Sequence, residues 1–95
     1  MTVSNINIKH DILGQLFHAK VKGGTAELRY RRKGDDWLDF YSTTVPEPSR
    51  GFGIATQLVA TGLKFARQQH LKVKPTCPFV KDYLERHQED QELVI

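Results

Sequence analysis

The segment Arg50-Gly51-Phe52-Gly53-Ile54-Ala55 has the residue types of an anion-binding turn. Its two glycines allow the backbone to approach a ligand closely. The apolar residues that follow have helical spacing, and the first amides of such a helix have no partner within it and lie at the positive end of its dipole. Arg50 can add a charged contact to a phosphate oxygen. The segment therefore predicts a cradle for an anion such as pyrophosphate.

Two common nucleotide-binding signatures do not fit this segment. The dinucleotide pattern G-x-G-x-x-G needs a glycine at position 56, where the chain has Thr56. The Walker pattern needs Gly-Lys-Ser/Thr, and the first lysine after Gly53 is Lys64. The local residues also leave a plainer interpretation open, in which the two glycines only form the turn into a helix.

Cys77, the chain's single cysteine, is the second candidate for chemistry. Pro78 favours the first position of a helix, so Cys77 is expected to precede that helix, where the helix dipole favours a thiolate. Such a thiolate can act as a nucleophile. The alternative is a small buried side chain without a chemical role.

Alternating apolar and polar residues predict four strands before residue 46. The predicted strands lie around Ile6 and Ile8 and over residues 16–21, 25–32 and 37–44. The turns between them are expected at residues 9–14, where Asp11 and Gly14 supply turn chemistry, at Gly23-Gly24 and at residues 33–36. The first half of the chain is therefore expected to be an antiparallel meander.

After residue 46 the spacing changes to that of helices. Apolar residues from Ile54 to Ala66 predict a helix that ends near Gln69. Residues 70–74 predict a short strand, and residues 79–87 predict a second helix whose packed side carries Phe79, Val80, Tyr83 and Leu84. This order predicts an α+β domain with a mainly antiparallel sheet and two packed helices.

The strand over residues 37–44 also carries three aromatic rings beside a basic segment, a combination found in platforms for single-stranded nucleic acid. Trp37 and Tyr41 should lie on one face of the strand and Phe40 on the other, so we expect core packing instead. The basic residues are expected to form a solvated sheet edge, and they are Arg29, Arg31, Arg32 and Lys33.

Composition narrows the class of protein. Ninety-five residues, 39% of them hydrophobic, suffice for one small domain over residues 1–95. One cysteine excludes an intramolecular disulfide, and no metal site is expected.

No apolar stretch approaches the roughly 20 residues of a membrane span, and residues 1–5 lack the features of a signal peptide, so we expect a cytoplasmic protein without a membrane partner. A net charge of +3 is smaller than that of most dedicated DNA-binding modules.

Four sequence blocks follow one another along the chain, and they are A-x-L-x-Y at residues 26–30, T-x-V-P at 43–46, R-G-x-G-I-A at 50–55 and P-x-C-x-F-V at 75–80. In this order, and covering most of residues 6–94, they resemble the minimal, single-domain subgroup of the GNAT superfamily of acetyl-CoA-dependent N-acetyltransferases. Arg50, Gly53 and Ala55 match the acyl-CoA pyrophosphate motif Q/R-x-x-G-x-G/A of that superfamily.

The resemblance implies a GNAT-like fold and an N-acetyltransferase that uses acetyl-CoA to acetylate a small amine or a protein lysine. In such a fold the strand ending near Val45 separates from the strand ending near Pro75, the pantetheine arm lies in the gap, and the acetyl thioester ends close to Cys77. The implied cofactor contacts are the backbone of Val45, the side chain of Arg50, and the turn that contains Gly51, Phe52, Gly53, Ile54 and Ala55.

The catalytic route stays open between two alternatives. Cys77 could accept the acetyl group and pass it on, or the amine could attack the thioester directly with the help of a general base. No base stands out, since His18 and His70 are expected at the surface and the remaining candidates, His87 and Glu89, lie at the end of the second predicted helix. Tyr83 could donate a proton to the leaving thiolate or simply pack in the core.

The chain departs from the subgroup at two places. Ser42 and Thr44 stand where members commonly have the His and Glu of H-T-E-V-P, and residues 87–90 read H-Q-E-D where H-P-E-Y is usual. The main alternative is therefore a non-catalytic module that binds CoA or acyl-CoA, although Cys77 within its motif favours the enzyme. A small RNA-binding domain is a third possibility, which predicts steeply salt-dependent binding.

Overall fold

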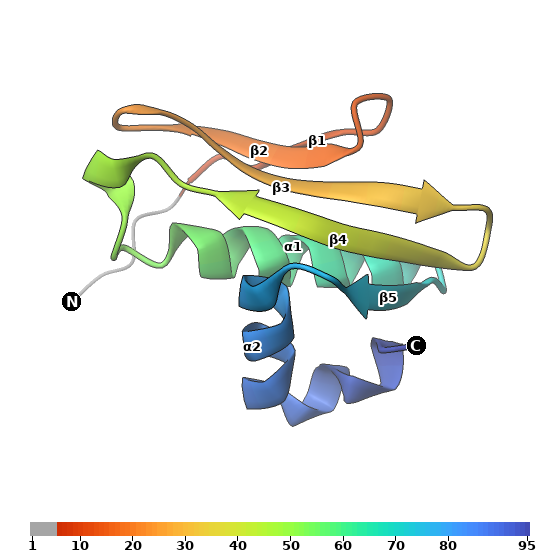
Figure 1. Ribbon diagram of the computed structural model, residues 1–95. Coiled ribbons are helices and arrows are strands. Elements are labelled where there is room, and N and C mark those ends of the chain that lie inside the picture. Colours follow the sequence, from red (N-terminus) through yellow and green to blue (C-terminus); the bar gives the residue numbers. More distant parts are fainter. Residues whose placement is uncertain (1–5) are drawn as a thin grey trace.

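The computed structural model describes residues 6–95, which form a five-stranded sheet and two α-helices (Figure 1). The strands occur in the order β1-β2-β3-β4-β5, and their bounds are β1 Lys9–Asp11, β2 Leu16–Val21, β3 Gly24–Lys33, β4 Trp37–Thr44 and β5 Lys72–Pro75. The helical elements are η1 Glu47–Ser49, α1 Ile54–Gln68, α2 Pro78–Arg86 and η2 Gln88–Leu93. Strands β1 to β4 form an antiparallel meander, and β5 pairs with β4 in parallel. The predicted fold class is therefore confirmed.

Helix α1 packs against one face of the sheet, which we call the inner face. The alternating residues of β3 and β4 that point to this face are buried, as Leu28 and Phe40 show. Gly62 of α1 allows close packing there, because a Cβ atom at this position would lie 3.0 Å from both Leu28 Cδ2 and Phe40 Cζ. Helix α2 and η2 pack beside β5 and against α1. No helix in the part of the chain that the structure describes is long and apolar enough to cross a membrane.

A bulge in β4 decides which residues reach the site. Arg29 pairs with Ser42 and Tyr30 pairs with Phe40, so Tyr41 has no register partner on β3. A strand with strict alternation would place Thr43 on the same face as Trp37. The extra residue instead turns Thr43 to the inner face, opposite Leu28.

The predicted position of the first strand is wrong. Strand β1 occupies Lys9–Asp11, inside the expected turn, and Ile6 and Ile8 precede it. The strand packs through His10, whose ring stacks on Phe17 at a centroid distance of 4.0 Å. A histidine ring that packs on an aromatic ring leaves no pattern in the spacing of apolar residues, so the sequence does not reveal this strand. The turn residues are as expected, since the Gly14 amide donates a hydrogen bond of 2.9 Å to Asp11 Oδ1.

Two further expectations hold only in part. Arg31, Arg32 and Lys33 extend beyond the end of β2 and are exposed, as expected of a solvated edge, whereas Arg29 is half-buried and paired with both β2 and β4. Core packing holds for Phe40, whereas Trp37 and Tyr41 are only half-buried and lie on the opposite face, which we call the outer face. The remaining strands and both helices lie within about two residues of their predicted bounds.

Candidate functional site

A cleft of about 500 Å³ lies at the point where β4 and β5 part. The two strands pair only from Trp37 and Lys72 to Phe40 and Pro75, and β4 then continues without β5 to Thr44. The cleft is bordered by the end of β4, the glycine turn with the first residues of α1, and the start of α2, and the lining residues are Thr43, Thr44, Val45, Ser49, Arg50, Gly51, Gly53, Ile54, Ala55, Thr56 and Phe79.

The glycine turn has the backbone geometry that its sequence suggests. Gly51 and Gly53 have φ angles of +87° and +77°, in the left-handed region that side chains other than glycine rarely adopt. No side chain caps the N-terminus of α1, and no acidic residue lies in its first turn. The first amides of α1 therefore remain available at the positive end of the helix dipole, beside the cleft.

The β2–β3 hairpin anchors this turn from outside the cleft. Ser49 is buried, and its Oγ donates a hydrogen bond of 2.7 Å to the carbonyl of Lys22. Gly23 packs closely on Pro48, where a Cβ atom would lie 2.9 Å from the proline ring. This support cannot be predicted from the sequence alone, because a long-range contact between two loops leaves no local pattern.

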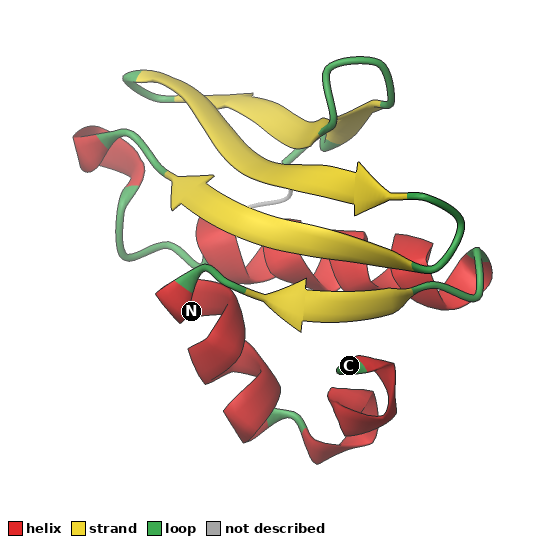
Figure 2. Ribbon diagram, turned by 45° about the vertical axis from the view of Figure 1, so that its right-hand side comes forward, coloured by secondary structure: helices red, strands yellow, loops and turns green. Residues whose placement is uncertain are grey.

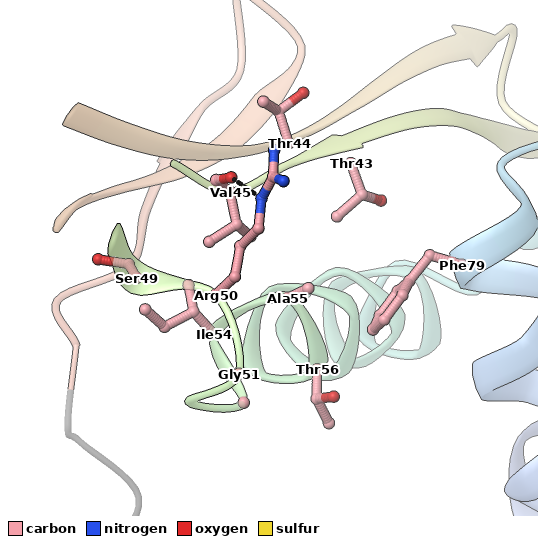
Figure 3. Close-up of a pocket in the computed structure, with 11 residues that line it drawn as sticks. Thr43, Thr44, Val45, Ser49, Arg50, Gly51, Ile54, Ala55, Thr56 and Phe79 are labelled. Carbon is pink, nitrogen blue, oxygen red and sulfur yellow. Dashed lines mark hydrogen bonds between the residues drawn. The ribbon is translucent and has the colours of Figure 1, made fainter. Parts of the chain in front are cut away.

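Arg50 connects two walls of the cleft. Its Nε donates a hydrogen bond of 3.0 Å to the carbonyl of Val45, the residue that follows β4 (Figure 3). The guanidinium group is exposed, and only its Nε is used by this bond. Its remaining nitrogens can donate to an anion at the start of α1.

Cys77 occupies the N-cap position of α2, with Pro78 at the first helical position, as the sequence predicted. Its amide donates a hydrogen bond of 2.8 Å to the carbonyl of Phe40. The thiol is 6% exposed and lies 3.3 Å from the Thr43 hydroxyl, which is itself part of the cleft wall. The β4 bulge thus places a polar group between Cys77 and the cleft.

The predicted packing of Phe79 is wrong. Val80 and Leu84 are buried and Tyr83 is half-buried, but Phe79 is 38% exposed and lines the cleft. Successive helix residues differ by about 100°, so Phe79 leaves the apolar side that Val80 occupies. Figure 3 shows its ring across the cleft from Arg50.

Several other candidates lie away from the cleft. The Phe52 side chain is 47% exposed and borders a separate hollow near Pro48. His87 stacks on Tyr83 at 3.8 Å, and burial raises the pKa of the Tyr83 hydroxyl. His70 is exposed and His18 is half-buried.

The lining of the cleft, within residues 6–95, contains no histidine and no carboxylate. In the same part of the chain, no group of three His, Cys, Asp or Glu residues could hold a metal ion. The polar side chains of the cleft are hydroxyls and one guanidinium, which suit an anionic ligand better than a cation.

Comparison with known proteins gives consistent matches. The sequence model of the GCN5-related N-acetyltransferase family matches residues 16–93. The Protein NATD1 of Xenopus tropicalis is 30% identical over 86 residues, which cover 88% of this chain and 79% of that protein. The NATD1 of Homo sapiens is 31% identical over 84 residues, which cover 86% of this chain and 74% of that protein.

The fold also has a solved counterpart. The solution structure of a GCN5-like protein of Staphylococcus aureus superposes with a TM-score of 0.73. The two sequences are 25% identical, and the match covers 97% of this chain and 90% of the other.

Proposed function

The chain belongs to the GCN5-related N-acetyltransferase family, and we propose that it uses acetyl-CoA to acetylate an amine. One observation carries the proposal: the cleft joins the uncapped N-terminus of α1 to Thr43, which contacts Cys77. When bound, acetyl-CoA supplies an acetyl group already activated as a thioester. The acceptor is either a small amine or an exposed lysine of another protein.

The residues of the cleft fit this cofactor. A pyrophosphate needs backbone donors and positive charge, and both lie at the start of α1, where nothing acidic competes. The amides of Phe52, Gly53, Ile54 and Ala55 and the side chain of Arg50 would hold it, and the open space at Gly51 leaves room for it. The backbone of Val45 and the ring of Phe79 would border the pantetheine arm.

We assign Cys77 as the catalytic residue of this proposal. Its sulfur lies at the start of α2, 3.3 Å from the Thr43 hydroxyl, and a cysteine sulfur can act as a nucleophile toward a thioester. The buried thiol lies behind Thr43, so an acyl group would reach it from the Thr43 side of the cleft. Direct attack by the amine is the competing route, in which Cys77 only shapes the cleft.

A non-catalytic module that binds CoA or acyl-CoA is the second candidate. The specific observation in its favour is that no histidine or carboxylate among the described residues lines the cleft, so none can take a proton from an attacking amine. Under this alternative the cleft binds the cofactor and the reaction does not occur.

Calorimetric titration with acetyl-CoA tests the cradle. We expect Arg50→Ala to weaken binding about tenfold or more, because a hydrogen bond to a charged group is lost. Arg86→Ala is the matched control, since Arg86 is an exposed arginine at the far end of α2, paired with Asp82. If the wild-type protein does not bind acetyl-CoA at millimolar concentration, the proposal is wrong.

Turnover separates the enzyme from the binding module. With a panel of amines and lysine peptides, the enzyme releases free CoA, and Cys77→Ala should lose turnover at unchanged affinity for acetyl-CoA. Full turnover by Cys77→Ala would favour direct attack by the amine. Tight binding without turnover on any amine would favour the module.

A further inference from the structure

The outer face of the sheet carries four cations around two residues of β4. By strand register, Arg31 and Lys74 lie on either side of Asp39, and Lys33 and Lys72 lie on either side of Trp37. All four basic side chains are exposed. Figure 2 shows α1 behind the sheet and no helix in front of β3 and β4 within the described part of the chain. We call these four residues the cation frame.

Contacts with neighbouring groups orient three side chains of the cation frame. The Arg31 guanidinium lies over the Tyr41 ring at 4.2 Å, and Lys74 Nζ lies 5.8 Å from the centre of the Trp37 ring. Lys72 Nζ donates a hydrogen bond of 2.6 Å to the carbonyl of Glu92. None of the four forms an ion pair with a carboxylate of residues 6–95. Three of the four exposed charges thus have contacts that hold them without an ion pair, and by register the Asp39 carboxylate lies between Arg31 and Lys74.

Asp39 is the unusual member of this face. It is only 9% exposed, and its Oδ1 is buried without a hydrogen-bond partner. Its two register partners, Arg31 and Lys74, could neutralise it but lie over aromatic rings instead. The face therefore combines unpaired exposed cations with an unpaired buried acceptor.

We infer that the outer face binds an extended acidic segment of a partner protein, with carboxylates at alternate positions. Residues two apart in a strand are separated by about 6.6 Å, and this spacing applies to Arg31 and Lys33, to Lys72 and Lys74, and to alternate side chains of an extended peptide. Carboxylates of such a segment pair with the cation frame. The inference does not depend on acetyl transfer.

A single-stranded nucleic acid fits the same face less well. Its bases need free ring faces for stacking, and cations already lie over the rings of Trp37 and Tyr41.

Fluorescence anisotropy without CoA tests the inference. The probe is a labelled ten-residue peptide with glutamate at alternate positions, and its glutamine counterpart and a labelled oligothymidylate serve for comparison. We expect the glutamate peptide to bind wild-type protein, and Arg31→Glu/Lys74→Glu to weaken that binding about tenfold or more. Lys64→Glu/Lys81→Glu is the matched control, since it changes the net charge equally on exposed positions of α1 and α2.

If both double variants weaken binding of the glutamate peptide equally, the effect comes from net charge alone and the inference is wrong. Tighter binding of the oligothymidylate than of the glutamate peptide, or no binding of the glutamate peptide at millimolar concentration, would also overturn the inference. Amide chemical shifts of the wild-type protein give a second measurement that does not rely on variants. We expect the glutamate peptide to shift amides of β3, β4 and β5 at the cation frame, and shifts confined to other elements would contradict the inference.

Discussion

The two faces of the sheet differ most clearly along β4, which contributes to both. On the inner face, Leu38 and Phe40 are completely buried beneath α1. On the outer face, Trp37 and Tyr41 remain half-buried, and Asp39 lies between them without a partner. Side-chain volume limits which residues the inner face can hold, so substitutions there should mainly change stability. Charge distinguishes the outer face, so substitutions there should mainly change binding.

The bulge at Tyr41 adds a third region to this comparison. Beyond it, the inner-facing position holds Thr43 rather than an apolar residue, and the cleft begins there. The cleft is therefore a continuation of the inner face, at the point where β5 no longer pairs with β4. The core determines where such a site lies, and the few polar residues at the end of the inner face determine its chemistry.

Phe40→Ala should have the largest effect on stability. The ring is 1% exposed and packs edge-on against Tyr30 at 5.9 Å, so its removal should lower the free energy of unfolding by about 3–5 kcal/mol. Urea denaturation followed by circular dichroism measures this loss. Tyr41→Ala, one residue along on the outer face, should cost about 1 kcal/mol or less, because it mainly removes a contact with Arg31. Equal losses would contradict the division between the faces.

The inner face is also the part of the molecule that the sequence predicted best. Strands β2, β3 and β4 and helix α1 each have one apolar side, and their periodicity is sufficient to place them. The proline after Cys77 correctly predicted that Cys77 occupies the N-cap position of α2. Both signals are local in the chain, which is why a single sequence is sufficient to predict these elements.

The missed features depend on contacts distant in sequence. Strand β1 has three residues and packs through His10, so it has no apolar period. The β4 bulge follows from pairing with β3, which the sequence does not reveal. Strict alternation along β4 would place Thr43 on the outer face with Trp37, whereas the bulge turns it to the inner face. The spacing places Phe79 on the packed side of its helix, because an aromatic residue beside an apolar helical stripe gives no sign that a cleft opens there.

Gly62→Val should have the next largest effect. Its first added carbon would lie 3.0 Å from Leu28 and Phe40, so we expect overpacking to lower the free energy of unfolding by about 1–3 kcal/mol. Ala60→Val is the matched control, because Ala60 is exposed on the same helix and the change there costs only helix propensity, about 0.5 kcal/mol. Urea midpoints of the two variants give the comparison, and equal midpoints would mean that α1 moves away from the sheet at little cost.

Asp39→Val should be stabilising, although it removes a charge that lies between two cations. A buried acceptor without a partner costs free energy, and valine fits a strand better than aspartate, so we expect a gain of about 1 kcal/mol. The melting temperature measures this gain. The variant should also bind the acidic peptide at least as tightly, because a like charge is lost. A lower melting temperature would mean that attraction to Arg31 and Lys74 outweighs the missing hydrogen bond.

The smallest expected effect concerns the titratable ring of the inner face. Burial lowers the pKa of His10, and the charge of Asp11 only partly opposes this. In the unfolded chain the pKa returns to about 6.5. Between the two pKa values the unfolded state binds more protons, so the free energy of unfolding should fall as pH drops below about 6.5. Wild-type protein should therefore have a lower urea midpoint at pH 5 than at pH 7.

A double variant isolates this contribution from the carboxylates that also titrate in that range. His10 Nε2 and the Tyr30 hydroxyl share a hydrogen bond of 2.7 Å, so His10→Phe alone would leave a buried hydroxyl unpaired. His10→Phe/Tyr30→Phe removes both partners and keeps an aromatic ring against Phe17 and Phe65. Its midpoint should change less between pH 7 and pH 5 than that of the wild type. If the two proteins change equally, protonation of His10 is not coupled to folding, and the inner face tolerates a charge at its β1 edge.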